Sequence, residues 1–383
     1  MKPTVILTAA LLCVLSPISF AKPLKVFILA GQSNMEGHAG VQTLDQLGKH
    51  PTHGHLLKKI KNDDGTYVVR DDVFVSYKKE NEHIKRPLSV GMGASGPESF
   101  GPELMFGIVM GDHCKEPVLL IKTCWGGHNL FGCFRPPSAG KAAYEIGDWP
   151  KPGDVGASYH KMVKEVRECL ANLDTDFPQL KGLEPEICGF VWFQGWNDMC
   201  APENIKQQVY DEYCSNFVHL VQDLRAEFKV PNMPAVVGEL GVGGDKVDLD
   251  KSLLAFRAAQ AKIATAPELK GAVGYVRTAP FWYPELDELP AKVNAEEQRV
   301  RTTVAASLKE QMKDKPESAD PKKMEQLIKE AGDKALKEDA AYQQATKECD
   351  KHVCNWGFHY QGSARVYSMV GFSLAEAMKP MLK

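Results

Sequence analysis

Residues 27–37 read FILAGQSNMEG, an apolar run that passes directly into small and polar residues. The apolar part begins at Val26 and, with Lys25 before it, predicts a buried strand over 25–30. Ser33 follows Ala30 by three residues and lies between the amide side chains of Gln32 and Asn34. A hydroxyl presented in this way directly after a strand has to be interpreted together with the rest of the chain.

Four more apolar runs resemble the first, at 117–122, 187–193, 234–238 and 272–276. Their hydrophobicity is continuous rather than alternating, which is typical of strands buried on both faces of a parallel sheet. Amphipathic helical patterns at 159–173 and 203–228 lie between them. The alternation predicts an α/β fold, a three-layer α/β/α sandwich with a central parallel sheet and right-handed crossovers. Because ligand sites in such sheets lie at the carboxyl ends of the strands, Ser33 stands where a site is expected.

The composition is that of an ordinary globular protein. The 383 residues are 44% hydrophobic and 25% charged, with a formal net charge of -3. This balance gives no reason to expect nucleic acid or an anionic membrane surface as a partner.

The first residues predict a signal peptide over 1–21. Lys2 precedes an apolar stretch at 5–14, and Ser19 and Ala21 are small residues at the two positions that a signal peptidase reads. The apolar stretch is shorter than the roughly 20 residues of a membrane span, although an uncleaved anchor is the alternative. Cys13 lies inside the apolar stretch, so no lipobox is correctly placed. We expect an exported protein, periplasmic or secreted, whose mature chain is one domain over 22–383 without a membrane span.

Export would permit disulfides. Ten cysteines less Cys13 leave nine, so at least one thiol stays free or pairs between molecules. No pair of Cys-x-x-Cys motifs is present, and we expect neither a zinc ribbon nor any other metal site. Cys349 and Cys354 enclose a short loop and are the best candidates for a local bridge.

A charged segment at about 285–350 departs from the α/β pattern, since it is rich in Lys, Glu, Asp and Ala. Asp320 and Pro321 form a typical helix start, and a break is expected near Lys315 and Pro316. The segment predicts a helical insertion of two or more helices. It is either a solvated surface element or a lid, because it ends just before a histidine of interest.

Four polar islands lie close to the ends of predicted strands or near the C-terminus. They are Gly31-Gln32-Ser33-Asn34-Met35, Trp125-Gly126-Gly127-His128, Gln194-Gly195-Trp196-Asn197-Asp198 and Gly357-Phe358-His359-Tyr360. Acyl transfer needs a hydroxyl, a base and donors for the oxyanion. Ser33 can supply the hydroxyl and His359 the base, since an imidazole pKa near 6.5 suits proton transfer. A Gly126 or Gly127 N–H and the Asn197 amide can act as donors.

Each island alone has a structural interpretation. A serine after a strand is usually a turn or cap residue, two glycines form a loop, and Asn197-Asp198 can cap a helix. A single histidine is more often structural than catalytic. The combination of the four is what favours catalysis.

With these islands in this order, the chain resembles the SGNH hydrolases, closest to their sialate O-acetylesterase-like and acetylxylan-esterase-like branch. Gly31 to Met35 matches the branch's first block letter for letter, and the other three islands match the Gly-Gly, Gln-Gly-x-Asn and histidine blocks. The resemblance spans roughly 25–280 and 355–380. It implies a flavodoxin-like sheet, Ser33 as nucleophile and His359 as base. It also implies an oxyanion hole of the Ser33 N–H, a Gly126 or Gly127 N–H and Asn197, without metal or organic cofactor.

One position departs from the family pattern. Many relatives place an aspartate three residues before the histidine, where it orients the imidazole, and this chain has Trp356 there. Asp198 and Asp350 are the nearby candidates for the orienting acid, and a backbone carbonyl or another carboxylate are the alternatives. An orienting acid can be worth about 10⁴ in rate, so this residue bears directly on activity.

Further side chains are candidates for substrate binding. Tryptophans can stack on a sugar ring, although Trp192, inside a strand, is expected to be core. Arg135 could meet an anionic substrate group. The candidates are Gln32, Gln194, Trp125, Trp196, His128 and Arg135.

The sequence thus predicts an exported serine esterase that removes O-acetyl groups from a sugar or polysaccharide. The substrate rests on the resemblance alone. One alternative is a catalytically idle carbohydrate-binding protein, suggested by Trp356, and another is a hydrolase of non-carbohydrate esters. The sugar, the acetyl position and the oligomeric state stay open.

Overall fold

The computed structural model describes residues 22–142, 155–246, 248–313 and 320–382. The predicted signal peptide at 1–21 lies outside the described residues. Within them, no helix is both long enough and apolar enough to cross a membrane.

A seven-stranded sheet in the order β4-β3-β6-β1-β7-β8-β9 forms the centre of the molecule. Five strands match the predicted ones: β1 Pro23–Gly31, β6 Val118–Cys124, β7 Glu184–Phe193, β8 Ala235–Gly238 and β9 Val273–Val276. Sequence analysis missed β3 Val73–Lys78 and β4 His83–Pro87. All neighbours are parallel except β3 and β4, so the expectation of a parallel sheet needs correction at this edge.

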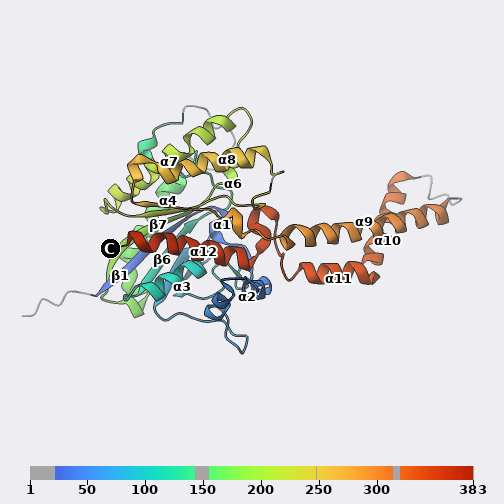
Figure 1. Ribbon diagram of the computed structural model, residues 1–383, viewed down its shortest axis with the longest axis horizontal. Coiled ribbons are helices and arrows are strands. Elements are labelled where there is room, and N and C mark those ends of the chain that lie inside the picture. The colour runs from blue at the N-terminus through green and yellow to red at the C-terminus, as the bar shows by residue number, and fades with distance from the viewer. Residues whose placement is uncertain (1–21, 143–154, 247, 314–319, 383) are drawn as a thin grey trace, which may run out of the picture.

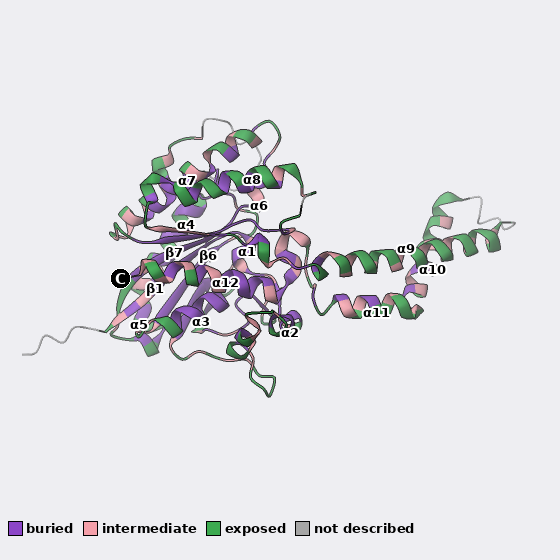
Figure 2. Cartoon of the chain, in the orientation of Figure 1, coloured by how far each residue is buried: buried purple, intermediate pink, exposed green. Residues whose placement is uncertain are grey.

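Helices cover both faces of the sheet, which confirms the three-layer α/β/α sandwich. Figure 1 shows α4 Ala157–Ala171, α7 Lys206–Glu227 and α8 Lys251–Ala261 on one face. On the other face, α3 Glu103–His113 packs against α12 Ala364–Met378. Figure 2 shows the buried residues gathered in the sheet and on the inner sides of these helices. The two predicted helices correspond to α4 and α7.

Apart from the helices of the charged segment, the remaining elements are short. They are α1 Ser33–Glu36, α2 Asp45–Gly48, α5 Leu173–Asp176, α6 Trp196–Met199, the paired strands β2 Ala39–Gly40 and β5 Ser99–Phe100, and 3-10 helices at Val41–Thr43, Gly54–Lys59, Pro137–Ala139, Pro178–Leu180, Lys262–Thr265, Pro267–Leu269, Ala279–Phe281, Gly357–Gly362 and Lys379–Met381.

The chain order places a topological switch point at the carboxyl end of β1, where open α/β sheets form their ligand crevice. From β1 the chain first builds β3, β4 and β6 on one side, and then β7, β8 and β9 on the other. Gly31 at the end of β1 pairs with Cys124 of β6 and with Phe193 of β7, so the three strands end level. In open α/β sheets, ligands bind at such a reversal of strand order.

A buried ion pair lies beneath this crevice. Lys122 of β6 places its ammonium 2.9 Å from Oε2 of Glu103 at the start of α3, and neither side chain is exposed to solvent. The same ammonium donates to the carbonyl oxygens of Glu36 at 2.7 Å and Met92 at 2.8 Å. Because all these partners satisfy one buried cation, the turn after β1 is tied to the core.

The charged segment forms three helices, α9 Glu285–Met312, α10 Pro321–Glu338 and α11 Ala340–Cys349, which we call the arm. Asp320 accepts from the N–H groups of Lys322 and Lys323, which confirms the predicted helix start. The expected break near Lys315 and Pro316 falls outside the described residues. Figure 1 shows the arm running away from the sheet, and Figure 2 shows it mostly exposed.

The predicted bridge between Cys349 and Cys354 is wrong. Both thiols are free, as are the other seven described cysteines. Cys349 is buried at the end of α11, whereas the Cys354 thiol lies beside Gly362 and donates to its carbonyl oxygen at 3.2 Å. The two side chains therefore belong to different packing environments.

Candidate active site

The first three islands meet at the carboxyl ends of the three central strands. Ser33 opens α1 directly after β1, Gly126 follows β6, and Asn197 lies in α6 after β7. Since these strands end level, the residues that follow emerge at one edge of the sheet. The predicted nucleophile and its predicted oxyanion donors are therefore neighbours.

Two glycines make room for this arrangement. A Cβ on Gly31 would lie 2.2 Å from the Phe193 carbonyl oxygen, so only glycine allows β1 and β7 to approach so closely there. A Cβ on Gly126 would lie 3.8 Å from the Ser33 Cβ and 3.1 Å from Glu36 Oε2. Gly126 thus borders the space beside the Ser33 hydroxyl.

Gly127 has a φ of 80°, and a Cβ on it would meet nothing within 4 Å. Both glycines of the second island are exposed at the carboxyl end of β6. Burial raises the pKa of the nearby Glu36 carboxyl, and the charge of Lys122 and, last, the Gly126 amide act against this shift. Which of the two N–H groups would face an oxyanion stays a prediction.

Gln32 connects the first island to the third. Its Oε1 accepts from the N–H groups of Gly195 and Asn197 at 3.3 and 3.1 Å, and its Nε2 donates to Asn197 Oδ1 at 2.8 Å. Because Oδ1 of Asn197 is occupied in this way, the Nδ2 group of that side chain faces elsewhere and keeps its donors. Gln32 is only 1% exposed, so its predicted role in substrate binding is wrong. It positions Asn197 instead.

Asp198 is fully buried and does not orient His359, which corrects one of the two candidates for the acid. Its carboxylate accepts from the N–H groups of Leu130 and Phe131 at 2.9 and 3.0 Å, and from Gln194 Nε2. Burial raises the pKa of Asp198 to about 6, against these hydrogen bonds. Gln194 is likewise buried and bonded internally, so it too is structural rather than substrate-binding.

The loop that carries His359 lies against the loop that carries Ser33. Asn34 Nδ2 donates to the Phe358 carbonyl oxygen at 3.1 Å, and Asn34 Oδ1 accepts from the Tyr367 hydroxyl at 2.9 Å. The first bond joins the immediate neighbours of Ser33 and His359, which are 326 positions apart in the chain. Within the described residues Ser33 Oγ is not hydrogen-bonded to His359, and such bonds commonly tighten only when substrate is bound.

Backbone strain shapes the His359 loop. Tyr360 and Gln361, in the 3-10 helix Gly357–Gly362, have φ values of 52° and 57°. Non-glycine residues adopt this left-handed conformation at a cost, so surrounding contacts have to hold it.

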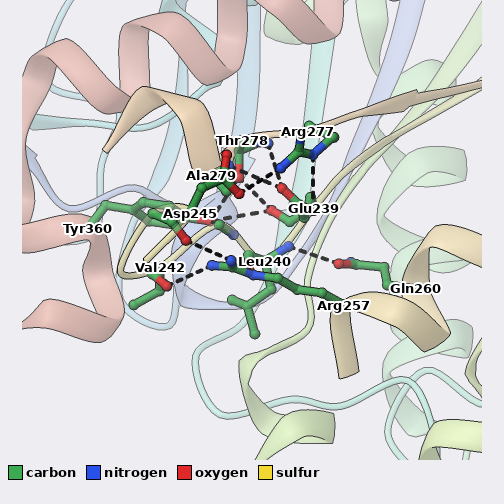
Figure 3. A network of polar contacts seen from close by, with 12 residues as sticks. Glu239, Leu240, Val242, Asp245, Arg257, Gln260, Arg277, Thr278, Ala279 and Tyr360 are labelled. Carbon is green, nitrogen blue, oxygen red and sulfur yellow. Dashed lines mark hydrogen bonds and ion pairs between the residues drawn. The ribbon is translucent and has the colours of Figure 1, made fainter. Parts of the chain in front are cut away.

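Those contacts come from the carboxyl end of β8. The fully buried Tyr360 hydroxyl accepts from the Gly241 N–H at 2.8 Å and lies 3.3 Å from the Glu239 carbonyl oxygen. Figure 3 shows Tyr360 reaching a network in which Glu239 accepts from the N–H groups of Thr278 and Ala279. In the same network the Arg257 guanidinium donates to three carbonyl oxygens, those of Leu240, Val242 and Gly244. Sequence analysis did not find this network, because its members lie in no recognisable motif.

His359 is oriented by an amide. Its Nδ1 lies 2.9 Å from Asn355 Oδ1, and its ring stacks on His38 with centroids 3.7 Å apart. Burial lowers the pKa of His359 to about 4, so the imidazole is neutral at pH 7. Trp356, at the position of the family's aspartate, is 71% exposed.

Asp350 ends α11 on the surface, and no hydrogen bond joins it to His359 in the described part of the chain, which corrects the second candidate. Sequence reasoning missed Asn355 and His38 because it searched for carboxylates. An amide four residues before the histidine was the available signal.

Three of the other substrate-binding candidates are half-buried, and the fourth is buried. Trp125 and His128 are half-buried at the crevice edge, with Lys161 4.5 Å above the Trp125 ring and His128 Nδ1 2.7 Å from Ser158 Oγ. Trp196 is also half-buried and packs against Phe358.

Arg135 is wrong as a pocket residue. It is buried, and it donates to the Phe131, Ala139 and Gly140 carbonyl oxygens and to Glu212. Trp192 is fully buried, as expected for a core residue. No group of His, Cys, Asp and Glu side chains suited to a metal ion occurs among the described residues.

The model of a family described as "Carbohydrate esterase, sialic acid-specific acetylesterase" matches residues 23–272. The chain belongs to this family. It is accordingly a carboxylic ester hydrolase of the carbohydrate esterase kind. The matched region includes the first three islands of this carbohydrate esterase and ends before the arm and His359.

Individual relatives are distant from this carbohydrate esterase. An Arabidopsis thaliana protein named "Probable carbohydrate esterase" is 23% identical over 229 residues, which cover 59% of this chain and 72% of the relative. The X-ray structure of that protein has a TM-score of 0.40 and 18% identity, with coverage of 67% and 86%. A carbohydrate acetylesterase from Xanthomonas citri has a TM-score of 0.40 and 17% identity over 68% of this chain and 51% of its own.

Proposed function

We propose that the protein is an exported serine esterase that removes O-acetyl groups from a carbohydrate, with Ser33 as nucleophile and His359 as general base. The observation that carries the proposal is the meeting of Ser33, Gly126 and Asn197 at the level ends of β1, β6 and β7. The hydrogen bond between Asn34 and Phe358 brings the histidine loop to the same place.

In the proposed reaction the Ser33 hydroxyl oxygen attacks the carbonyl carbon of the ester while its proton passes to His359 Nε2. The tetrahedral intermediate collapses with cleavage of the bond between the carbonyl carbon and the sugar oxygen, and His359 gives its proton to that departing oxygen, which leaves as a hydroxyl. Water then gives a proton to His359 and attacks the acyl-enzyme. Collapse of this second intermediate releases acetate and restores Ser33 with the proton from His359. A neutral imidazole is needed at the start, and the lowered pKa of His359 provides it.

Three donors would stabilise the negative oxygen of both intermediates. They are the Ser33 N–H, an N–H of Gly126 or Gly127, and Asn197 Nδ2. Gln32 supports this role because it occupies the Asn197 carbonyl oxygen and so leaves the amide nitrogen as the free end. One such donor typically contributes about 10²–10³ in kcat.

A half-buried aromatic rim supports a sugar substrate. Trp125 and Trp196 lie on the islands that flank Ser33, and an aromatic face can pack against the apolar face of a sugar ring. The family description supports an acetylated carbohydrate as the substrate. The apolar stretch at 5–14 supports export.

The decisive experiment compares Ser33→Ala with Ser215→Ala, a control serine on the exposed side of α7. We expect Ser33→Ala to lower kcat for p-nitrophenyl acetate by about 10⁴–10⁶-fold at unchanged unfolding temperature. Ser215→Ala should keep the wild-type rate. Equal kcat values in the two variants would disprove the assignment of Ser33 as the nucleophile.

The substrate class is tested by measuring acetate release from acetylated xylan and O-acetylated sialic acid. Hydrolysis of lipid esters is measured under the same conditions for comparison. Release from lipid esters alone would contradict a carbohydrate substrate. Export is tested by sequencing the N-terminus of the protein recovered outside the cytoplasm, where Lys22 is the expected first residue.

A further inference from the structure

Asn355 bridges two stacked imidazoles. Its Oδ1 lies 2.9 Å from His359 Nδ1, and its Nδ2 lies 3.4 Å from His38 Nδ1. The two rings are nearly parallel, with an interplanar angle of 6°. His38 is only five residues after Ser33, so the turn that carries the predicted nucleophile also supplies a partner to the histidine loop.

A backbone contact determines which end of the Asn355 amide faces which ring. The Trp356 N–H lies 2.8 Å from Oδ1 of Asn355. A backbone N–H can only donate, so the atom that faces it has to be the oxygen. The amide cannot be turned over without placing its NH₂ group against this N–H.

The orientation of the amide determines both tautomers. An amide oxygen only accepts, so Nδ1 of His359 has to carry the proton and Nε2 keeps its lone pair. An amide nitrogen only donates, so Nδ1 of His38 has to accept and its proton sits on Nε2. That Nε2 atom is buried and has no hydrogen-bond partner within the described residues.

We propose that His38 and Asn355 are positioning residues that keep His359 in the one neutral tautomer able to accept a proton at Nε2. The inference rests on the proposed esterase function for its catalytic meaning. It assigns a role to His38, which holds the far end of the amide, and it explains why the chain can have Trp356 where relatives have an aspartate.

The physical basis is the difference between two ways of placing an amide beside a histidine. Replacing the orienting aspartate of a Ser-His-Asp triad by asparagine costs about 10⁴ in kcat because the histidine adopts the wrong tautomer. Here the Trp356 N–H and His38 both hold the amide with its oxygen toward His359. The usual penalty of an asparagine is thereby avoided, although the amide carries no charge to stabilise the imidazolium.

The arrangement requires a neutral His38, because an imidazolium would place a proton on Nδ1 against the Asn355 NH₂ group. Burial, followed by the charges of His359 and Lys122, lowers the pKa of His38 to about 3. The other titratable groups near the two rings are the Cys354 thiol, which lies beside the His38 carbonyl oxygen, and the Tyr367 hydroxyl, which lies near the His38 backbone. Lys122 is paired with Glu103.

The first test is nitrogen NMR of the imidazoles at pH 7 in the full chain, with His38→Phe and His359→Phe used for assignment. We expect a proton on Nδ1 of His359 and on Nε2 of His38. In Asn355→Asp the second carboxylate oxygen faces His38, so the His38 proton should move to Nδ1. A His359 protonated on Nε2 in the wild type, or a His38 tautomer unchanged in Asn355→Asp, would overturn the inference.

The second test is the pH dependence of kcat/KM. A base acts only when unprotonated, so the wild-type rate should fall only as the pH decreases toward the His359 pKa of about 4. In Asn355→Asp the new negative charge favours the imidazolium, and the acid limb should move up by about 1 to 3 pH units. His38→Phe keeps the ring stack but removes the acceptor, and we expect kcat to fall by about tenfold with KM unchanged, a modest part of a general base's contribution.

A purely structural role predicts a different result. His38→Phe would then lower the unfolding temperature and leave the His359 tautomer and kcat unchanged. The NMR experiment needs no turnover, so expected tautomers together with an inactive wild type would count against the esterase proposal and not against the arrangement of His38 and Asn355.

Discussion

The α/β body and the arm use charge in opposite ways. In the body, Lys122 and Glu103 form an ion pair whose two side chains are 0% exposed, and the cation also satisfies two backbone carbonyls. In the arm, Arg301 and Asp333 pair at 2.9 Å across α9 and α10 with 38% and 46% of their side chains exposed. A buried pair is costly to break, whereas an exposed pair contributes little.

The difference shows which part of the chain holds the candidate site. The buried polar groups Gln32, Lys122 and Tyr360 each connect segments far apart in sequence, and each connection includes a residue within three positions of Ser33 or His359. The charges of the arm join one exposed helix to the next. Helix α9 is about 42 Å long at 1.5 Å per residue, yet only Leu286 and Val300 along it are buried.

The largest effect is expected from Lys122→Met, which tests whether the buried ion pair of the body contributes more to stability than the exposed pairs of the arm. The substitution leaves the Glu103 carboxylate buried without its cation and removes a donor from two carbonyl oxygens. We expect the free energy of unfolding to fall by about 3–5 kcal/mol, measured by urea denaturation. A loss below about 1 kcal/mol, the range of exposed pairs, would show that the body and the arm do not differ in this respect.

A smaller effect, here on the activation free energy rather than on stability, is expected from Asn197→Ala. This variant tests whether the body positions a catalytic donor. Removing one oxyanion donor should lower kcat by about 10²–10³-fold with a small effect on KM. Asn197→Asp is the matched variant, since it keeps an oxygen for the Gln32 amide but replaces the donor by a negative charge. If Asn197→Asp retained the wild-type kcat, the side chain would not face the oxyanion.

The smallest effect is expected in the arm. Arg301→Met removes exposed ion pairs with Glu297 and Asp333 and keeps most of the aliphatic side chain. We expect a change in unfolding free energy of about 0.2–1 kcal/mol and an unchanged kcat. A change in kcat would mean that the arm acts on the site and is more than a surface insertion.

The sequence was informative about elements with strong local signals. Five continuous apolar runs predicted the five central and neighbouring parallel strands, since strands buried on both faces need apolar residues at every position. Asp320 predicted a helix start because an N-cap is a local hydrogen bond. Strands β3 and β4 were missed, and β4 carries the charged residues of an edge strand, His83, Lys85 and Arg86, which hide its pattern.

The candidate site was predicted in part for the same reason. Ser33, Gly126, Asn197 and His359 follow recognisable motifs, and the structure brings their loops together. Gln32, Gln194 and Arg135 were assigned to substrate, because a polar residue in a motif does not reveal whether it faces the crevice or the core. Asp198 was a reasonable candidate by charge, and only its three buried donors exclude it.

The sequence by itself determined five of the seven strands of the sheet, the chemical groups available for acyl transfer and the family to which the chain belongs. Those properties depend on local residue types and their spacing. Only the tertiary structure decided that Asn355 bonds to His359 and that His38 stacks on its ring, that Asp198 lies in the core and that the arm extends away from the sheet. His38 and Asn355 are 317 positions apart, and Asp198 is 68 and 67 positions from its donors Leu130 and Phe131. A hydrogen bond between such residues exists only once the sheet has brought its carboxyl ends together.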